Sequence, residues 1–447
     1  MAKVITQRSI FLQALVLRGL FGFTLGLYLF VYPLTIFEAV GGDANKYTPL
    51  LFGAVFTFGI LLEALLELPL GALGDIKGYK FTLTGSFLFR SLYFVGLYFL
   101  TTPFILNHLD FSALLSFVTI GTFSIAYTLW SGTNSAWLYE SVEKYGDESK
   151  YERFLSSILS MHYSALILGA IIGAWLYFNG KGDFAYGLGF LLSGVAMIFC
   201  HLVITDPYDK KKRDDLERLH LFEQLRRVIS DAYRFCVKEK SLFLLIQLSA
   251  FFWLLVYVKD YLWPPYAMTA FSIKNLDIKW ITIILVMTFG RLLGNYIIVR
   301  LPGYPSNGDI GEVWKRLFFA CTLFAVPIAV LSLVGGFFME PGNNLFYFFV
   351  VLVGVASFAV GAKEAPFDVL MNRSISNAHV EGNKKGPNEV RATIISASTI
   401  FNGIVVLLFF VPTTVFGKQN TIQAWIIPAL LLLIVMTLTK KKVKGLK

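Results

Sequence analysis

The sequence predicts an all-α polytopic membrane protein, with twelve transmembrane helices in two pseudo-symmetric bundles of six. Hydrophobic residues make up 56% of the 447 residues, whereas charged residues make up only 15%. A soluble chain of this length could not hide so much apolar surface from water. Apolar runs of about 20 residues recur along the chain, and this is the length that spans a bilayer as a helix. Lys and Arg collect in the short segments between these runs, as is typical of cytoplasmic loops.

The apolar runs fall into two sets separated by a polar gap. The first set lies near 10–32, 48–70, 81–101, 111–139, 155–178 and 184–205. The second set lies near 242–266, 278–300, 314–334, 345–372, 390–413 and 421–439. We therefore predict an N-terminal six-helix bundle over 1–205, a linker over 206–241 and a C-terminal six-helix bundle over 242–447.

The linker carries the basic run 210–213, followed by apolar positions spaced close to one helical face, including Phe222, Ile229 and Cys236. An amphipathic helix of this kind lies on the inner membrane surface, where anionic lipid headgroups attract its basic residues. Membrane lipids are therefore an expected partner of the linker. Its role as a passive tether or as a lipid sensor stays open.

Several classes of protein are disfavoured by composition. The net charge of +10 is spread over loops and makes no basic stripe for nucleic acid. Three cysteines, Cys200, Cys236 and Cys321, imply no disulfide framework. The sequence has no metal-ligand cluster, no Ser-His-Asp pattern and no phosphate loop, so we expect neither an enzyme nor a cofactor. The start of the chain leads into the first apolar run without a cleavage site, so we expect a retained first span and both termini in the cytoplasm.

The segment between the second and third runs, 71–80, is the most informative motif of the chain. Gly71 allows a neighbouring helix to approach closely, and Gly78 allows a reverse turn. Asp75 offers a carboxylate to a helix N-terminus or to an Arg. Lys77 and Lys80 favour a cytoplasmic location for the segment, which we predict to be a tight hairpin loop.

This motif resembles the loop between the second and third helices of the major facilitator superfamily. Segments 67–71 and 131–140, together with Arg391-Ala392-Thr393, are similar to a bacterial exporter-like branch of drug/proton antiporters. The resemblance implies a monomeric secondary active transporter of the bacterial inner membrane. It also implies alternating access, a small-molecule substrate, and protons or another ion for coupling. With the cytoplasmic side closed, Asp75 would meet the N-terminus of the eleventh span beside Arg391.

The chain also departs from that pattern. The equivalent motif of the second half has no Asp and ends in Arg300-Leu301-Pro302-Gly303. Thr128 stands where many proton-coupled members carry an Arg, and Ala170 stands where many antiporters carry a Pro. These differences argue against an ordinary proton-driven drug exporter.

Charged groups within spans are costly unless they are paired or hydrated, so each is a candidate for coupling or substrate binding. At a rise of about 1.5 Å per residue, most of them fall in one layer on the cytoplasmic side of the midplane. The candidates are Arg18, Glu63, Glu67, Arg90, His162, Arg291, Lys363, Glu364 and Asp368. Lys259 and Asp260 should lie much further out, beside Pro264-Pro265, which we expect to break the seventh span.

Structural interpretations of the same residues stay open. Glu63 could pair with Arg90, and Glu364 could pair with Lys363 or Arg291. Arg18 could extend to the inner surface, and His162 could simply be hydrogen-bonded. Glu67 is expected to join the network of the loop motif. Glu364 and Asp368 are the preferred protonatable groups, because a carboxylate in a cavity of low dielectric can exchange protons near neutral pH.

We therefore expect a proton-coupled secondary transporter, with efflux favoured over uptake. Uptake of an anionic metabolite is an alternative, as is a transport-inactive receptor or scaffold. If several of the basic residues within spans are unpaired, an anionic substrate is favoured. If each is matched by a carboxylate, a near-neutral cavity and an amphipathic substrate are favoured.

Overall fold

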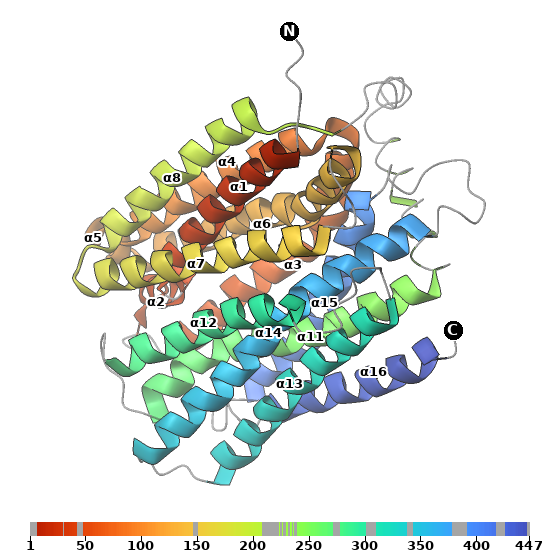
Figure 1. Cartoon of the computed structure of the whole chain (residues 1–447). Coiled ribbons are helices and arrows are strands. Elements are labelled where there is room, and N and C mark those ends of the chain that lie inside the picture. Colours follow the sequence, from red (N-terminus) through yellow and green to blue (C-terminus); the bar gives the residue numbers. More distant parts are fainter. Residues whose placement is uncertain are drawn as a thin grey trace.

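In the computed structural model, the chain forms a bundle of long helices (Figure 1). The structure describes residues 7–29, 31–42, 48–145, 151–207, 239–270, 278–300, 310–337, 343–377, 391–416 and 425–444, with single positions between 223 and 236. Most of the linker predicted to be amphipathic, including its basic run 210–213, lies outside the described residues.

The first half of the chain contributes six long helices, each built on one of the predicted apolar runs. They are α1 (Gln7–Leu29), α3 (Thr48–Lys77), α4 (Tyr79–Leu100), α6 (Leu109–Tyr145), α7 (Tyr151–Phe178) and α8 (Gly182–Val203). Two short helices, α2 (Tyr32–Ala39) and α5 (Pro103–Leu106), lie at the ends of α1 and α4.

The second half contributes six more long helices. They are α11 (Lys240–Ala270), α12 (Ile278–Arg300), α13 (Ile310–Phe337), α14 (Asn343–Asn377), α15 (Arg391–Phe416) and α16 (Ile426–Lys444). Ten of the twelve long helices in the described part of the chain are apolar enough over 18 residues to cross a membrane. The two others are α15 and α16, and the predicted all-helical membrane fold with twelve helices is confirmed.

Figure 1 shows α1 to α8 on one side of the molecule and α11 to α16 on the other. The start of α1 and the end of α16 lie at the same end of the bundle, whereas α2 and α5 lie at the opposite end. We call the first the Asp75 end, because Asp75 lies near the last turn of α3, and the second the α2 end.

Glycines allow the closest helix crossings within each half. A Cβ at Gly22 would collide with the carbonyl of His162, and one at Gly173 with the carbonyl of Leu27, so α1 and α7 touch backbone to backbone. In the second half a Cβ at Gly294 would collide with the carbonyl of Phe358 on α14. Small residues permit such contacts between membrane helices.

Two sequence expectations about helix ends are wrong. The predicted hairpin loop is nearly all helical, because α3 continues to Lys77 and α4 begins at Tyr79, leaving Gly78 as the whole turn, with φ of 92°. The expected break at Pro264-Pro265 does not occur either, because α11 runs to Ala270. Prolines are tolerated in membrane helices where neighbouring groups satisfy the freed carbonyls, as Pro69, Pro327 and Pro366 are within their helices.

Candidate functional site

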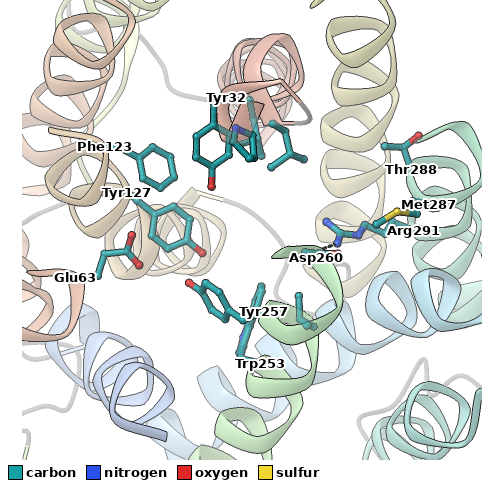
Figure 2. Close-up of a pocket in the computed structure, with 14 residues that line it drawn as sticks. Tyr32, Glu63, Phe123, Tyr127, Trp253, Tyr257, Asp260, Met287, Thr288 and Arg291 are labelled. Carbon is teal, nitrogen blue, oxygen red and sulfur yellow. Dashed lines mark hydrogen bonds and ion pairs between the residues drawn. The ribbon is translucent and has the colours of Figure 1, made fainter. Parts of the chain in front are cut away.

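A cavity lies between the two halves and consists of two adjoining chambers. The central chamber has a volume of about 250 Å³ and reaches Ser135 and Asp368 near the Asp75 end. The second chamber, of about 180 Å³, reaches Tyr32 and Pro33 at the α2 end (Figure 2). Both are lined by Glu63, Tyr127, Trp253, Tyr257 and Arg291, among others, so the two chambers share a wall. A concave, partly apolar site between two halves suits a small solute.

Below the cavity, Asp75 closes the Asp75 end by bridging the two halves. Its carboxylate accepts hydrogen bonds from the backbone N–H of Ala392 at 3.2 Å and of Thr393 at 2.9 Å. The Thr393 hydroxyl donates a third bond at 2.6 Å. These donors belong to the first turn of α15, where unpaired N–H groups and the helix dipole favour an anion. The structure thus contains the contact between Asp75 and the eleventh span that the sequence predicts.

Close packing supports this contact. A Cβ at Gly71 of α3 or at Gly132 of α6 would collide with the side chain of Ser396, which lies one turn further along α15. At the turn itself, the positive φ and the nearby Asp206 carboxylate leave no room for a Cβ at Gly78. Asp206 also accepts a hydrogen bond from the backbone N–H of Lys80 at 3.3 Å.

Arg391 lies beside this closure in a network of its own. Its guanidinium donates to the Oδ1 atom of Asn372 at 3.0 Å and lies 3.8 Å from a carboxylate oxygen of Glu140. The same carboxylate accepts a hydrogen bond from the hydroxyl of Tyr79 at 2.7 Å. Arg391 also lies over the ring of Tyr139, at 4.2 Å from the ring centroid. The network links α4, α6, α14 and α15 at the Asp75 end.

On the wall formed by the first half, Arg18 is held by an amide and a stack of rings. With the Asn134 amide oriented to accept, its oxygen lies 2.5 Å from Nη2 and 3.1 Å from Nε of Arg18. Arg18 lies 5.3 Å from the Trp130 ring, which stacks on Phe21 at 3.8 Å. Arg18 thus lines the central chamber instead of extending to the inner surface.

Arg90 also packs against this stack, on the ring of Phe21, and does not line either chamber. Its guanidinium lies 3.7 Å from the Phe21 ring and donates to the Phe21 carbonyl at 3.2 Å and to Thr24 at 3.1 Å. It is 1% exposed, so it does not reach the substrate space. No ion pair joins it to Glu63 among the described residues, and that structural interpretation is therefore wrong. The Phe21 carbonyl and ring hold Arg90 instead.

The carboxylates of α3 face the opposite half. Glu63 lines both chambers and is bonded to the hydroxyls of Ser124, at 3.3 Å, and Tyr257. One turn further along, the buried Glu67 accepts a hydrogen bond from Ser131 and lies close to Thr399 of α15. Glu67 is therefore located where α3 faces the other half, and its role in the motif network stays a prediction.

On the wall formed by the second half, Asp260 pairs with two cations. Arg291 donates to its Oδ2 atom at 2.6 Å, and Lys259 contacts its Oδ1 atom. The expectation that Lys259 and Asp260 lie well above the layer of Arg291 is therefore wrong. Counting residues from a helix end ignores how far that helix projects beyond the membrane and how far an Arg side chain reaches.

Three more candidates lie on one stretch of α14. Lys363, Glu364 and Asp368 all line the central chamber. Glu364 lies close to the hydroxyl of Tyr163, and Asp368 accepts a hydrogen bond from Ser135 at 3.5 Å. No ion pair of Glu364 with Lys363 or Arg291 occurs in the part of the chain that the structure describes. Asp368 thus adds a further contact between the two halves near the Asp75 end.

The sequence analysis did not identify the hydroxyl, amide and aromatic side chains that surround these charges. For His162 it predicted only an approximate depth in the span. His162 lines the chamber with Nδ1 3.4 Å from the carbonyl of Arg18. The missed residues are Ser124, Asn134, Tyr127, Tyr163, Ser249, Trp253, Tyr257 and Phe367. Such residues are common in every span, and no periodic pattern in the sequence shows which of them face the cavity. Apolar helices that are buried on several sides have no single polar face.

The comparisons with known proteins agree with this architecture. A human organic anion transporter, MFSD10, has a TM-score of 0.63 at 13% identity, over 97% of this chain and 99% of that chain. A bacterial homologue of the iron transporter ferroportin, in an outward-facing state, has a TM-score of 0.65 at 15% identity, over 97% and 98%. The proton:xylose symporter XylE has a TM-score of 0.68 at 12% identity, over 97% and 95%.

At these identities the similarity concerns the fold alone. No curated protein sequence matches the chain. The sequence model of the Major Facilitator Superfamily matches residues 14–410, which include nearly all the helices that form the cavity and its closure. The chain therefore belongs to the Major Facilitator Superfamily of transporters.

Proposed function

We propose that this protein is a secondary active transporter that exchanges protons for a small amphipathic solute, with efflux as the favoured direction. The observation that supports it best is the position of the cavity between the two halves, lined by carboxylates and closed at one end by Asp75. A site that lies between two halves can be reached from either side in turn if the halves rock about it.

The closure at the Asp75 end suits a switch. Asp75 is held by three hydrogen bonds to a single helix turn, so a modest rotation of α15 would release all of them together. Each such bond contributes only about 0.5–3 kcal/mol, so substrate or proton binding can tip the balance. We infer that the structure represents the state closed at the Asp75 end.

The charges of the central chamber support an amphipathic solute over a strongly anionic one. Three basic residues line it, and three carboxylates line it as well; the six are Arg18, Arg291, Lys363, Glu63, Glu364 and Asp368. The sequence analysis associates unpaired basic residues with an anionic substrate, and Arg18 and Lys363 form no ion pair among the described residues. Our proposal is based instead on the equal numbers of basic and acidic residues, which leave the chamber close to neutral when all six are charged. A scaffold without transport would have no use for so many costly buried charges.

Glu364 and Asp368 are proposed as the coupling groups. Both line the central chamber on α14, four residues apart and on one helix face. Both lie beside hydroxyl groups, those of Tyr163 and Ser135, and a hydroxyl can accept from a protonated carboxyl or donate to a charged one. Asp368 also bridges to Ser135 of the other half, so its protonation state can affect the closure of the Asp75 end.

Proton movement in proteoliposomes tests this proposal. Purified protein is reconstituted with a pH-sensitive dye inside, a pH gradient is imposed, and pools of small amphipathic solutes are added. We expect solute-dependent proton flux that is lost in Glu364→Gln or Asp368→Asn. Asp110→Asn, at an exposed position of α6, should leave it unchanged. If both α14 variants keep full flux, these residues do not couple transport to protons.

A further inference from the structure

An aromatic cage for an ammonium group lies at the edge of the central chamber and holds the side chain of Lys363. Its Nζ lies 4.2 Å from the ring centroid of Phe367, 4.9 Å from that of Phe252 and 5.1 Å from that of Trp253. All three distances are within the range in which a cation is attracted to the face of a ring. Ser249 provides one further contact, at 3.4 Å.

The surroundings of this lysine are unusual for a buried charge. Lys363 is 3% exposed, yet within the described residues no carboxylate lies close enough to form an ion pair with it. Buried charges are normally paired, because an unpaired charge loses its hydration without compensation. Here the negative faces of three rings and one hydroxyl take the place of a carboxylate.

The cage opens to the substrate space. Lys363, Trp253, Phe367 and Ser249 all line the central chamber, and Trp253 also lines the chamber at the α2 end (Figure 2). For a molecule that enters from the α2 end, Trp253 is therefore the first residue of the cage to be contacted. Once Lys363 has left the cage, an anion at this place would lie against ring faces that repel it, whereas an ammonium group would find the same attraction that now holds Lys363.

We propose that the cage of Phe252, Trp253 and Phe367 is a binding site for the ammonium group of an organic cation, and that Lys363 occupies it when the substrate is absent. The inference rests on the proposed transport function and specifies its substrate class. Lys363 acts as a tethered competitor of the substrate. Once displaced, its ammonium can pair with Glu364 or Asp368, which follow it on α14 and line the same chamber.

In this arrangement the substrate displaces Lys363, and this displacement is the step that couples substrate binding to the carboxylates. The cation enters the cage, and Lys363 becomes the ion-pair partner of a neighbouring carboxylate. A lysine that leaves the cage costs little if it gains such a partner, because ion pairing offsets the loss of the ring contacts. The affinity for the substrate therefore depends on how much more strongly the cage binds the ammonium group of the substrate than that of Lys363.

Three probes with a common benzyl group and different heads test the inference by isothermal titration calorimetry in nonionic detergent. They are benzyltrimethylammonium, its uncharged isostere neopentylbenzene, and the anion phenylmethanesulfonate. We expect the ammonium to bind more tightly than its isostere. Lys363→Gln should strengthen its binding by about tenfold, since the competitor is removed. Adding Trp253→Leu to that variant should reverse the gain.

Lys279→Gln is the matched control, because Lys279 also lies over a ring, 5.6 Å from that of Phe346, and does not line either chamber. If Lys363→Gln instead abolishes binding of the sulfonate, Lys363 is an anion site and the inference is overturned. Equal ammonium binding by the wild type and Lys363→Gln would also overturn it. Because binding is measured without a gradient, failure of proton coupling would leave this result unaffected, and the two proposals can fail separately.

Discussion

Glycines make two different kinds of contact in this molecule, one within each half and one between the halves. Within the halves, Gly22 lies against the backbone of His162 and Gly361 lies against the backbone of Arg291. Between the halves, Gly71 lies against the side chain of Ser396. A backbone cannot move aside without the whole helix, whereas a side chain can rotate.

This difference distinguishes the helix crossings within each half, whose helices carry the charged side chains of the cavity, from the contact between the halves, which we expect to open and close. His162 and Arg291 are both cavity residues, so the tightest crossings fix the helices that carry the polar groups. The crossings are not equivalent by symmetry, because α1 meets α7 in the first half and α12 meets α14 in the second. Between the halves, the backbone N–H groups of α15 donate hydrogen bonds to the carboxylate of Asp75. Such bonds can break and form again during a transport cycle.

Breaking a crossing within a half should have the largest effect. Gly361→Ala places a Cβ against the Arg291 carbonyl, and neither helix can yield locally. Overpacking of this kind costs about 1–3 kcal/mol, and contact with backbone favours the upper part of that range. We expect a large fall in the thermal unfolding temperature of the purified protein.

Gly187→Ala and Gly194→Ala are the matched controls, because a Cβ at either position meets open space. Both should unfold at the wild-type temperature or slightly above it, since Ala favours helix. If Gly361→Ala is as stable as these controls, the crossing of α12 and α14 is not tight.

Weakening the contact between the halves should have a smaller effect. It should change the population of the open state and leave the unfolding temperature nearly unchanged. Asp75→Asn removes the charge at the N-terminus of α15 but keeps an oxygen that can accept a hydrogen bond. Loss of the charge should cost about 0.3–2 kcal/mol, so the state open at the Asp75 end becomes several-fold more populated. Spin labels at Glu143 of α6 and Lys441 of α16, both exposed, should show a longer distance while the unfolding temperature hardly changes.

An unchanged distance distribution in Asp75→Asn would mean that this contact does not hold the Asp75 end closed. Gly71→Ala provides an independent test by steric means, since its Cβ would press on Ser396. The double variant with Ser396→Gly should return the distance toward that of the wild type.

Hydropathy and charge in the sequence predict the twelve helices, because burial in lipid imposes long apolar runs on every span. The contact of Asp75 with α15 could also be predicted, since a carboxylate near a helix N-terminus follows from a local motif. The ion pairs could not be predicted in this way. Asp260 pairs with Arg291 as well as with its neighbour Lys259, and Glu63 is bonded to the hydroxyl of Ser124 and not to Arg90.

The reason is that ion pairing depends on helix tilt, rotation and side-chain reach, none of which is encoded in residue spacing along one helix. The cage around Lys363 shows this most clearly, because its rings come from α11 and α14 and belong to two distant parts of the sequence. A lysine in an apolar run indicates a functional charge. Only the packing of the two helices shows that rings, and not a carboxylate, surround it.

The smallest expected effect concerns one bond of the closure. Thr393→Val removes the hydroxyl that donates to Asp75 at 2.6 Å and keeps the two backbone donors of α15. Loss of one side-chain hydrogen bond to a charged group should cost about 1.5 kcal/mol or less, because the remaining donors still solvate the carboxylate. We expect the distance between the same spin labels to shift in the direction of Asp75→Asn but over a smaller share of the population. Thr393→Ser keeps the hydroxyl and should match the wild type. If Thr393→Val opens the Asp75 end more than Asp75→Asn does, the side chain of Thr393 holds the halves together by its packing, and the charge of Asp75 is secondary.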